Sequence, residues 1–399
     1  MAVQIRQHRP GKDLDDFVSF HHELYRDDPA WVPPLNMEIR ERLSPGRNPF
    51  FEHAEATLFT AWEGARMVGR ISAQIDHEHL RIHQDETGFF GFFDTVDDPR
   101  VAQALVDAAA EWLALRGMRR MRGPFNLSIN EEMGLLVDGF EHPPFLMTPH
   151  ALPHQGPLAE ATGLEKVMDL YHWRYVSGEI PKRALRAHEQ IRSLPEVRFR
   201  RVDKSRMRSE VDTLLEIFND AWSDNWGFVP ATPAETRKMA SDLKMILDPD
   251  LAFFVEIHGR PMGLCVALPN LNEATHDLRG ALAPFGLFKL LWRLKVKRPS
   301  SARLMLLGIR RELRGVKRYG ALSTAMYAEL AQKGAAKGYT WGELSWTLET
   351  NRPVNLGIRA MGGEVYKTYR MYEKPIGADA DAGGADRADR QAQGAEEAG

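Results

Sequence analysis

The order of predicted strands and helices is nearly the same in the two halves of the chain, and this repetition constrains the fold more than any other feature. In the first half, apolar patterning predicts strand, helix, hairpin, strand, helix and strand at 3–6, 14–24, 56–75, 88–93, 101–115 and 118–122. The second half repeats the order at 197–202, 211–247, 251–268, 303–309, 321–338 and 340–347, followed by a helix after residue 351 and a strand at 365–372. This repetition predicts two mixed α/β domains with one topology.

A basic segment bounded by prolines at 181–195 separates the halves. We therefore expect an N-terminal domain over 1–180, a linker over 181–195 and a C-terminal domain over 196–376. Residues 377–399 contain only Ala, Gly, Gln and charged side chains. Such a segment cannot bury a core, so we expect a disordered tail there.

Composition excludes several classes of protein. The single cysteine, Cys265, rules out a disulfide framework and any site built from several Cys ligands. No uncharged apolar run reaches the roughly 18 residues that a transmembrane helix needs, and the amino terminus is too polar for a secretory signal. We expect a cytoplasmic protein, with the inner face of the cytoplasmic membrane as a second possible location.

Positive charge is concentrated in one stretch of the second half. The net charge of the chain is −3, but residues 285–318 contain eleven Lys and Arg against one acid, Glu312. This excess predicts an anionic partner such as phosphates, a lipid surface or nucleic acid. The cations do not alternate with aromatic residues as they do on base-stacking surfaces, so we do not expect nucleic acid as the partner.

A basic, glycine-punctuated turn lies within this stretch, between a predicted strand and a predicted helix. Gly315 and Gly320 allow the backbone to approach a ligand closely, and Arg314, Lys317 and Arg318 add positive charge. The backbone N–H groups that open the next helix also favour an anion. The turn predicts a pyrophosphate site, and the alternative is a basic loop at an ordinary helix start.

The turn and the segments after it resemble the GNAT superfamily of acyl-CoA N-acyltransferases. In that family a Gly-containing turn at a helix start holds the CoA pyrophosphate, and a strand, an Asn-initiated helix and a Tyr-rich last strand follow. Here the stretch from Trp346 to Asn351, a helix that ends near Gly362 and a Tyr-rich strand keep this order. The resemblance implies that acyl-CoA is the co-substrate and that its binding residues are Leu307, Gly308, Ile309, Arg314, Gly315, Lys317, Arg318, Tyr319, Gly320, Ala321, Asn351 and Asn355.

This chain departs from the GNAT pattern at two positions. Arg318 stands at the first glycine position of the turn, so binding of the phosphates would depend more on cations. Ile358 stands where many members carry a Tyr that protonates the departing thiolate. The acid must then come from elsewhere, and Tyr366 on the last strand is a candidate.

Candidate bases lie on the strand near 341–349. Alternation places Glu343 and Glu349 on one face, and the resemblance implies that this strand lines the acyl cleft. We expect Glu349 to take the proton of the attacking ammonium, with Glu343 and Glu131 next in line. The alternative for Glu349 is a capping or ion-paired carboxylate.

The first half looks like a degenerate copy, because its strand-to-helix junction is acidic. Asp94, Asp97 and Asp98 would repel a pyrophosphate, so we expect no CoA site there. A polar segment follows, and the residues expected to line the acceptor side of the cleft are Asn126, Ser128, Asn130, Glu131 and, from the second half, Trp346. Their alternative is a structural role in buried turns. The acids and histidines at 76–83 resemble a metal-ligand spacing, but we expect a solvated strand end and no metal.

An amphipathic segment interrupts the second half at 281–299. At 100° per residue, Lys289, Arg293 and Lys297 share one stripe, and the opposite face carries Leu287, Phe288, Leu291 and Leu294. This pattern is typical of a helix on a membrane surface, and a helix packed on its own domain is the alternative. We expect reversible contact between 281–299 and an anionic membrane.

Over nearly all of residues 1–375 the chain resembles a tandem-GNAT bacterial family that includes ceramide synthases. These enzymes transfer a fatty acyl group from acyl-CoA to the amine of a long-chain sphingoid base. The resemblance implies the same reaction here, and another amine acceptor is the alternative. Relatives are also labelled nucleotide pyrophosphohydrolases, but the sequence contains neither a Nudix box nor a convincing His-Asp metal cluster.

Overall fold

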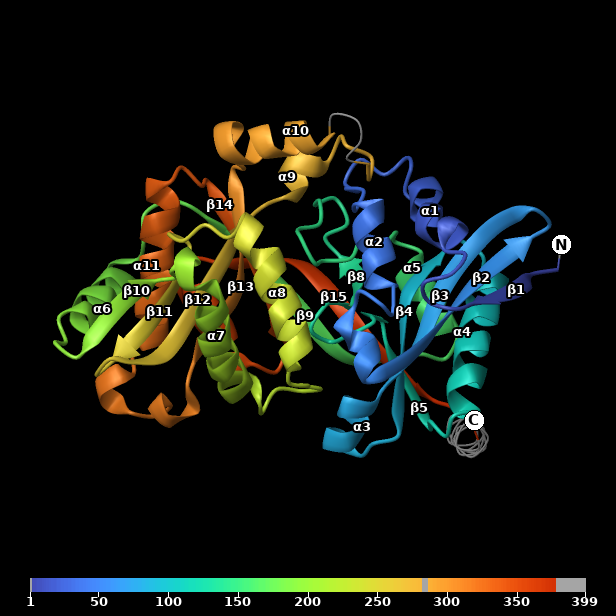
Figure 1. The fold of residues 1–399 in the computed structure, drawn as a ribbon, viewed down its shortest axis with the longest axis horizontal. Helices are drawn as coiled ribbons and strands as arrows, with labels where there is room; N and C mark the ends of the chain where they lie inside the picture. Colours follow the sequence, from blue (N-terminus) through green and yellow to red (C-terminus); the bar gives the residue numbers. More distant parts are fainter. Residues whose placement is uncertain (1, 282–285, 378–399) are drawn as a thin grey trace, which may run out of the picture.

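The computed structural model describes residues 2–281 and 286–377. The tail expected at 377–399 and the part of the amphipathic segment at 282–285 therefore lie outside the described residues, except for Gly377. A single mixed sheet of 13 strands runs through both halves of the molecule, and helices cover it (Figure 1). None of the helices in the described residues is long and apolar enough to cross a membrane.

The first half follows the predicted order and adds elements that the sequence did not indicate. Its strands are β1 (Gln4–His8), β2 (Ala54–Glu63), β3 (Arg66–Asp76), β4 (Thr87–Thr95), β5 (Arg120–Gly123), β6 (Phe125–Asn126), β7 (Glu132–Met133), β8 (Leu135–Asp138) and β9 (Glu165–Val176). Its helices are α1 (Asp15–Leu24), α2 (Asn36–Arg42), α3 (His77–His83), α4 (Pro99–Ala114) and α5 (Gln155–Ala161). The unpredicted elements include β9 and α3, and α3 stands where a strand end was expected.

The second half agrees with its predicted elements to within a few residues. Its strands are β10 (Val197–Arg201), β11 (Ala252–Ile257), β12 (Arg260–Pro269), β13 (Ser301–Ile309), β14 (Trp341–Leu348) and β15 (Glu364–Pro375). Its helices are α6 (Lys182–Arg192), α7 (Met207–Trp222), α8 (Pro233–Ile246), α9 (Asn272–Thr275), α10 (Gly286–Trp292), α11 (Leu322–Ala336) and α12 (Arg352–Ala360). Most of the segment expected as a linker forms α6, whose Ala184 and Ile191 are fully buried in the core of this half.

The last strand of each half crosses to the other half. The sheet order is β1-β2-β3-β4-β5-β15-β9-β14-β13-β12-β11-β10, so β15 lies between β5 and β9, and β9 lies between β15 and β14. Both exchanged strands pair antiparallel with their neighbours. The two halves therefore share one sheet, while the domain limits near 181–195 stay a prediction.

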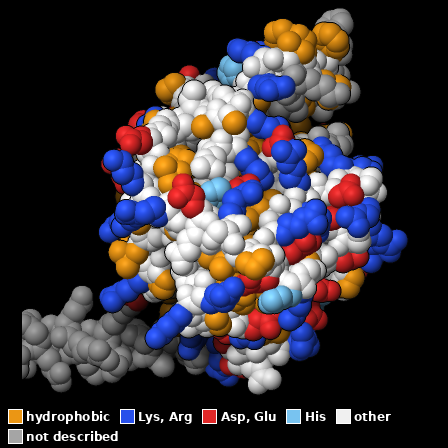
Figure 2. All heavy atoms as spheres, turned by 90° about the vertical axis from the view of Figure 1, so that its left-hand side faces the viewer, with side chains coloured by type: hydrophobic (Ala, Val, Ile, Leu, Met, Phe, Trp, Pro, Cys, Tyr) orange, Lys and Arg blue, Asp and Glu red, His pale blue; other side chains and the backbone are white. Residues whose placement is uncertain are grey.

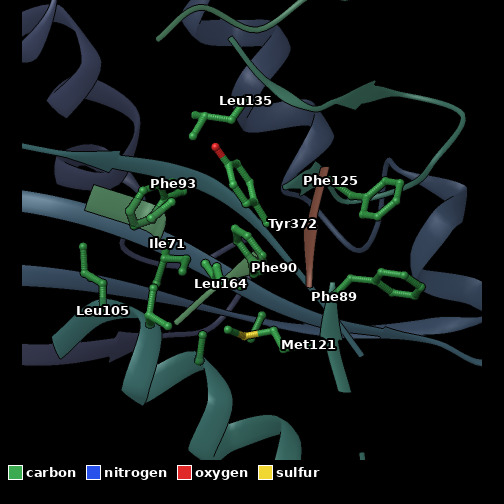
Figure 3. Close-up of a cluster of buried hydrophobic side chains, with 14 of the residues drawn as sticks. Ile71, Phe89, Phe90, Phe93, Leu105, Met121, Phe125, Leu135, Leu164 and Tyr372 are labelled. Carbon is green, nitrogen blue, oxygen red and sulfur yellow. The ribbon is translucent and has the colours of Figure 1, made fainter. Parts of the chain in front are cut away.

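The core of the first half contains side chains of the last strand. Tyr372 of β15 lies beside Phe90, Phe93 and Leu135 (Figure 3), and it is fully buried. Tyr369 and Met371 of β15 belong to the same apolar cluster. Pulling the halves apart would expose this surface to water, so the burial of apolar area opposes their separation.

Among the described residues, strands of the large sheet pair in parallel at two places, between β4 and β5 and between β13 and β14. The β13–β14 pairing covers only Ser301–Leu304 with Trp341–Leu344. Beyond these residues no pairing between the two strands is recorded, and the register of β14 against β9 shifts between Leu344 and Thr347. The strand ends at 305–309 and 345–348 are therefore free to line a ligand site.

Candidate active site

The loop from β13 to α11 contains the predicted pyrophosphate turn. It forms two short helical turns, Arg311–Leu313 and Lys317–Tyr319, before α11 begins at Leu322. No side chain caps α11, because its N-cap residue is Ala321. The N–H groups of its first turn therefore have no side-chain cap, and such groups attract an anion.

The cations of this loop are exposed but already paired, with one exception. Arg318 Nε lies 2.6 Å from Glu196 Oε1, and Arg314 Nη1 lies 3.4 Å from Asp224 Oδ2. Within the described residues no ion pair is recorded for Lys317. Exposed pairs of this kind contribute only about 0.2–1 kcal/mol, so both guanidinium groups can turn to a phosphate at small cost.

The equivalent junction of the first half is built differently. There α4 is capped by Asp98, whose Oδ1 accepts a hydrogen bond of 2.9 Å from the backbone N–H of Arg100. Asp94 is buried, and its Oδ2 accepts a 2.7 Å hydrogen bond from Arg70 Nε. A carboxylate thus occupies the place that corresponds to the predicted anion site at the start of α11.

The remaining residues expected to bind the cofactor surround the ends of β13 and β14. Leu307, Ile309 and Tyr319 pack against the apolar core of the second half. A side chain at Gly308 would lie 2.3 Å from the Trp222 ring of α7, so only glycine allows α7 to approach β13 here.

Two asparagines hold the start of α12. Asn351 caps this helix by accepting from Val354 N at 3.4 Å, and Asn355 donates to the Leu348 carbonyl at 3.0 Å. The buried Oδ1 of Asn355 has no hydrogen-bond partner among the described residues. A hydrogen-bond acceptor without a described partner therefore lies beside the end of β14.

Glu343 and Tyr366 meet in a buried polar cluster. Glu343 is completely buried and accepts hydrogen bonds from Tyr366 Oη and from Ser345 Oγ, the latter at 2.6 Å. His172 Nδ1 and Arg303 Nε lie 3.2 and 3.5 Å from the same carboxylate. Burial alone would raise the pKa of Glu343, but His172, Lys367 and Arg303 hold this pKa below its ordinary value. The group is therefore an ionised counter-charge.

Lys367 and Arg303 of this cluster, together with the neighbouring Tyr369, hold the loop at 143–149 through hydrogen bonds. Lys367 Nζ donates to the Pro143 carbonyl at 2.6 Å, Tyr369 Oη donates to Pro149 O at 2.9 Å, and Arg303 donates to Leu146 O. Burial lowers the pKa of Lys367 to about 8. The cluster thus ties strands β13, β14 and β15 to a loop of the first half.

Glu349 lies in a different group from Glu343. Its Oε2 is 2.8 Å from Lys166 Nζ, and its Oε1 accepts from the backbone N–H of Asp169 at 3.0 Å. Nearby, the partly exposed Trp346 packs against the core of the first half. The structure thus brings Glu343 and Tyr366 together but gives Glu349 separate partners.

The polar segment of the first half forms a connected turn. Asn126 Oδ1 accepts from Phe92 N at 2.7 Å and its amide donates to Glu132 Oε2 at 2.8 Å. Ser128 Oγ accepts from Asn130 N at 3.1 Å, and Asn130 in turn donates to the Val229 carbonyl of the second half at 3.1 Å. These contacts are those of a buried structural turn.

Glu131 differs from these neighbours in its electrostatics. It accepts a 3.0 Å hydrogen bond from Asn48 and lies 3.5 Å from Arg42 Nε. Burial raises the pKa of Glu131 to about 7, although Arg42 opposes the shift. A carboxyl group with this pKa can exchange a proton near neutral pH.

Three cavities adjoin these groups. The largest has an empty volume of about 1520 Å³, including its open mouth, and is lined by α1, α2, β4, the loop at 144–150 and α10. A second, of about 570 Å³, is lined by β13, β14 and α11 and includes Trp341 and Glu343. A third, of about 950 Å³, shares Tyr339 with the second and Ile246, Leu271 and Leu291 with the largest. Sequence reasoning missed all three because their walls come from distant segments.

The amphipathic segment exposes apolar side chains but not a stripe of free cations. Phe288 and Val296 are 75% and 64% exposed, and hydrophobic side chains gather over α10 at the top of the molecule (Figure 2). Asp277 pairs with Lys289 at 3.0 Å and also with Arg293. Asp277 therefore neutralises part of the charge of the predicted stripe, and the membrane contact stays a prediction. The side chains of Leu287 and Leu294 lie outside the description.

The acids and histidines at 76–83, whose spacing resembles a metal site, bond to other groups of the protein. Asp76 caps α3 and lies 2.9 Å from His53 Nδ1, and His79 Nε2 lies 3.0 Å from Asp85. In the described part of the chain, no group of three or more His, Cys, Asp or Glu is placed to hold a metal ion.

Comparison with known proteins places the chain in a family. No protein-family model matches the chain. The chain is 46% identical over 367 residues to the "Bacterial ceramide synthase" of Caulobacter vibrioides. The aligned region covers 91% of this chain and 95% of that protein. The chain belongs to the bacterial ceramide synthase family. Another member, "Protein YghO" of Escherichia coli, is 40% identical over 366 residues, or 91% of this chain and 93% of that protein.

Solved structures agree with this placement at the level of the fold. A "Tandem GNAT protein from the clavulanic acid biosynthesis pathway" superimposes with a TM-score of 0.57 at 13% identity, covering 94% of this chain and 99% of that chain. The prediction of two tandem GNAT-like units is thus confirmed. Membership of the ceramide synthase family makes the protein an acyltransferase.

Proposed function

We propose that this protein transfers a fatty acyl group from acyl-CoA to the amine of a long-chain sphingoid base. The observation that carries the proposal is the 46% identity, over nearly the whole chain, to a bacterial ceramide synthase. The cavities below α10 give independent support, since their size suits long alkyl chains. The alternative acceptor is another amine.

Acyl-CoA binding is proposed for the second half. The uncapped start of α11 and the cations at 314–318 suit the pyrophosphate. The ends of β13 and β14 do not pair with each other, so their facing edges can accommodate the pantetheine arm. The 570 Å³ cavity beside these strands is mostly apolar and suits the acyl chain. Carboxylate capping of α4 argues against a second CoA site in the first half.

Acyl transfer requires an uncharged amine. The ammonium loses one proton to a base, the amine nitrogen attacks the thioester carbonyl, and the C–S bond breaks as CoA leaves. The predicted catalytic groups stay Glu349, Glu343 and Tyr366. The residues predicted to line the acceptor side of the cleft stay Asn126, Ser128, Asn130, Glu131 and Trp346. All three carboxylates have a basic partner, and Glu131 gains support because burial raises its pKa to about 7, whereas the partners of Glu343 hold its pKa below the ordinary value.

We also propose that the protein is cytoplasmic and contacts the membrane reversibly. This contact would depend on the exposed Phe288, Trp292 and Val296 more than on charge, because Asp277 pairs with Lys289 and Arg293. Apolar side chains beside a few cations bind a bilayer surface without spanning it.

Product analysis tests the proposed function. Purified protein is incubated with palmitoyl-CoA and sphinganine in mixed micelles, and the lipids are analysed by mass spectrometry. We expect the N-acyl product, with one free CoA thiol per amide formed. Consumption of acyl-CoA with ethanolamine but not with sphinganine would replace the lipid acceptor by a small amine.

A further inference from the structure

We propose that the 1520 Å³ cavity of the first half binds the long-chain amine acceptor, with His21 and His150 as partners of its polar head. This inference rests on the proposed function and adds the place where the acceptor binds. The cavity lies among α1, α2 and β4 and reaches α10 of the second half.

The charges that line the cavity favour a cation. Glu38, Asp94 and Glu132 supply three carboxylates, while Arg42 and Arg70 supply two guanidinium groups. Both arginines are engaged, since Arg42 Nη1 lies 2.8 Å from Glu132 and Arg70 Nη2 lies 2.6 Å from Asp94. Glu38 Oε1 also lies 3.4 Å from Arg42 Nη2, and burial raises the pKa of Glu38, so the lining carries at most one net negative charge. Such a lining favours an ammonium group over the phosphates of CoA.

Two buried histidines line this cavity with unused ring nitrogens. His21 is 2% exposed, and neither of its ring nitrogens has a hydrogen-bond partner among the described residues. The His150 side chain is 3% exposed; its Nε2 lies 2.8 Å from Asp28 Oδ2, whereas its Nδ1 has no recorded partner. Burial lowers the pKa of both groups, so each ring is neutral near pH 7.

Unused buried nitrogens point to a ligand with polar groups. An unmet donor or acceptor is costly in a buried site, so these rings need partners that the described residues do not provide. A fatty acyl chain carries no such partner, but an amino alcohol supplies N–H and O–H groups as well as a hydrocarbon tail. The apolar wall formed by Trp31, Val32 and Phe92 suits that tail.

The cavity is lined in part by α10, and Arg303 links another part of its wall to β14. Its lining includes Leu290 and Leu291 of α10, next to the exposed Phe288 and Trp292, which gives a lipid a way in. At its other side, Arg303 donates to Leu146 O of the cavity wall and to Ser345 Oγ of β14 at 2.8 Å. The head of a bound amine would thus lie close to the strand where the thioester is expected.

Photolabelling tests the location. Sphinganine with a diazirine in its alkyl chain is irradiated with the full-length protein in the absence of acyl-CoA, and the labelled peptides are mapped. We expect labels at 31–39, 144–150 or 271–291, and competition by unmodified sphinganine. Labels confined to 327–344 would overturn the proposal while leaving acyl transfer intact. Correct labelling without any N-acyl product would instead refute the proposed function alone.

Variants test the role of the histidines. His21→Phe keeps a ring of similar shape and removes both unused nitrogens, so we expect the KM for sphinganine to rise about tenfold. The Kd for acyl-CoA should be unchanged, and the melting temperature unchanged or higher, because an unpartnered polar group has left the interior. The matched control His154→Phe alters a histidine that bonds to the Thr95 carbonyl outside the cavity. An unchanged KM in His21→Phe would overturn the contact with the polar head.

Discussion

Replacing Glu343 with Gln should destabilise the whole fold. The substitution keeps the shape of the side chain but removes the charge that compensates Arg303 and Lys367, which are 5% and 0% exposed. Removing one partner of a buried ion pair costs about 3–5 kcal/mol. Because β9 and β15 join the halves, we expect them to unfold together, with a melting temperature lower by about 4–6 °C.

Thermal unfolding followed by circular dichroism measures this effect, with Glu349→Gln as the matched control. Glu349 pairs with Lys166, whose side chain is 38% exposed, so its loss should cost only about 1 kcal/mol. Both variants are also tested for palmitoyl-CoA binding at a temperature where each is folded.

A stable but inactive variant would refute the reasoning. If Glu343→Gln melts within about 2 °C of the wild type and loses turnover by about 10²–10⁴, Glu343 acts on the substrate as a base rather than as a counter-charge. The same loss in Glu349→Gln, with acyl-CoA binding retained, would identify Glu349 as the base.

Three further predictions concern the cofactor loop, the membrane contact and pH. Arg314→Ala with Arg318→Ala should raise the Kd for acyl-CoA about tenfold in calorimetry and flatten its salt dependence; an unchanged Kd would remove the pyrophosphate site. Phe288→Ala with Trp292→Ala should reduce co-sedimentation with anionic liposomes, and normal sedimentation would mean that α10 does not contact the bilayer. The pKa of Lys367 is lowered from 10.5 to about 8 in the folded protein, so between pH 8 and pH 10.5 the unfolded chain binds more protons than the folded one. The contribution of this group therefore makes the free energy of unfolding rise by about 3 kcal/mol as the pH rises through that window. Urea unfolding of Lys367→Met should lack that rise, and an identical pH dependence in both proteins would show that Lys367 is not the group that titrates.

The repeated order of elements could be predicted because each element carries its own periodicity. The exchange of β9 and β15 could not, since both strands mix charged with apolar residues and their patterning does not specify which half they pair with. Alternation along β14 predicted one shared face for Glu343 and Glu349, but the register shift after Leu344 separates them into a buried cluster and an ion pair with Lys166.

The loop before α11 could be located from the sequence because its glycines, its cations and the start of α11 are contiguous, while its role in binding the cofactor stays a prediction. The large cavity could not be located, because His21 and His150 come from segments that only the fold brings together. The pairing of Asp277 with two cations of the amphipathic segment was likewise missed, since it depends on how α9 and α10 pack.

A single-turnover experiment tests the central claim most directly. The protein, in excess, is mixed with acyl-CoA carrying a ¹³C-labelled carbonyl and with sphinganine, and the labelled carbon is followed by mass spectrometry. We predict that the label appears in an amide of sphinganine as fast as free CoA thiol is released. Release of the label as free fatty acid, with no amide formed, would contradict the assignment of an acyltransferase for long-chain amines.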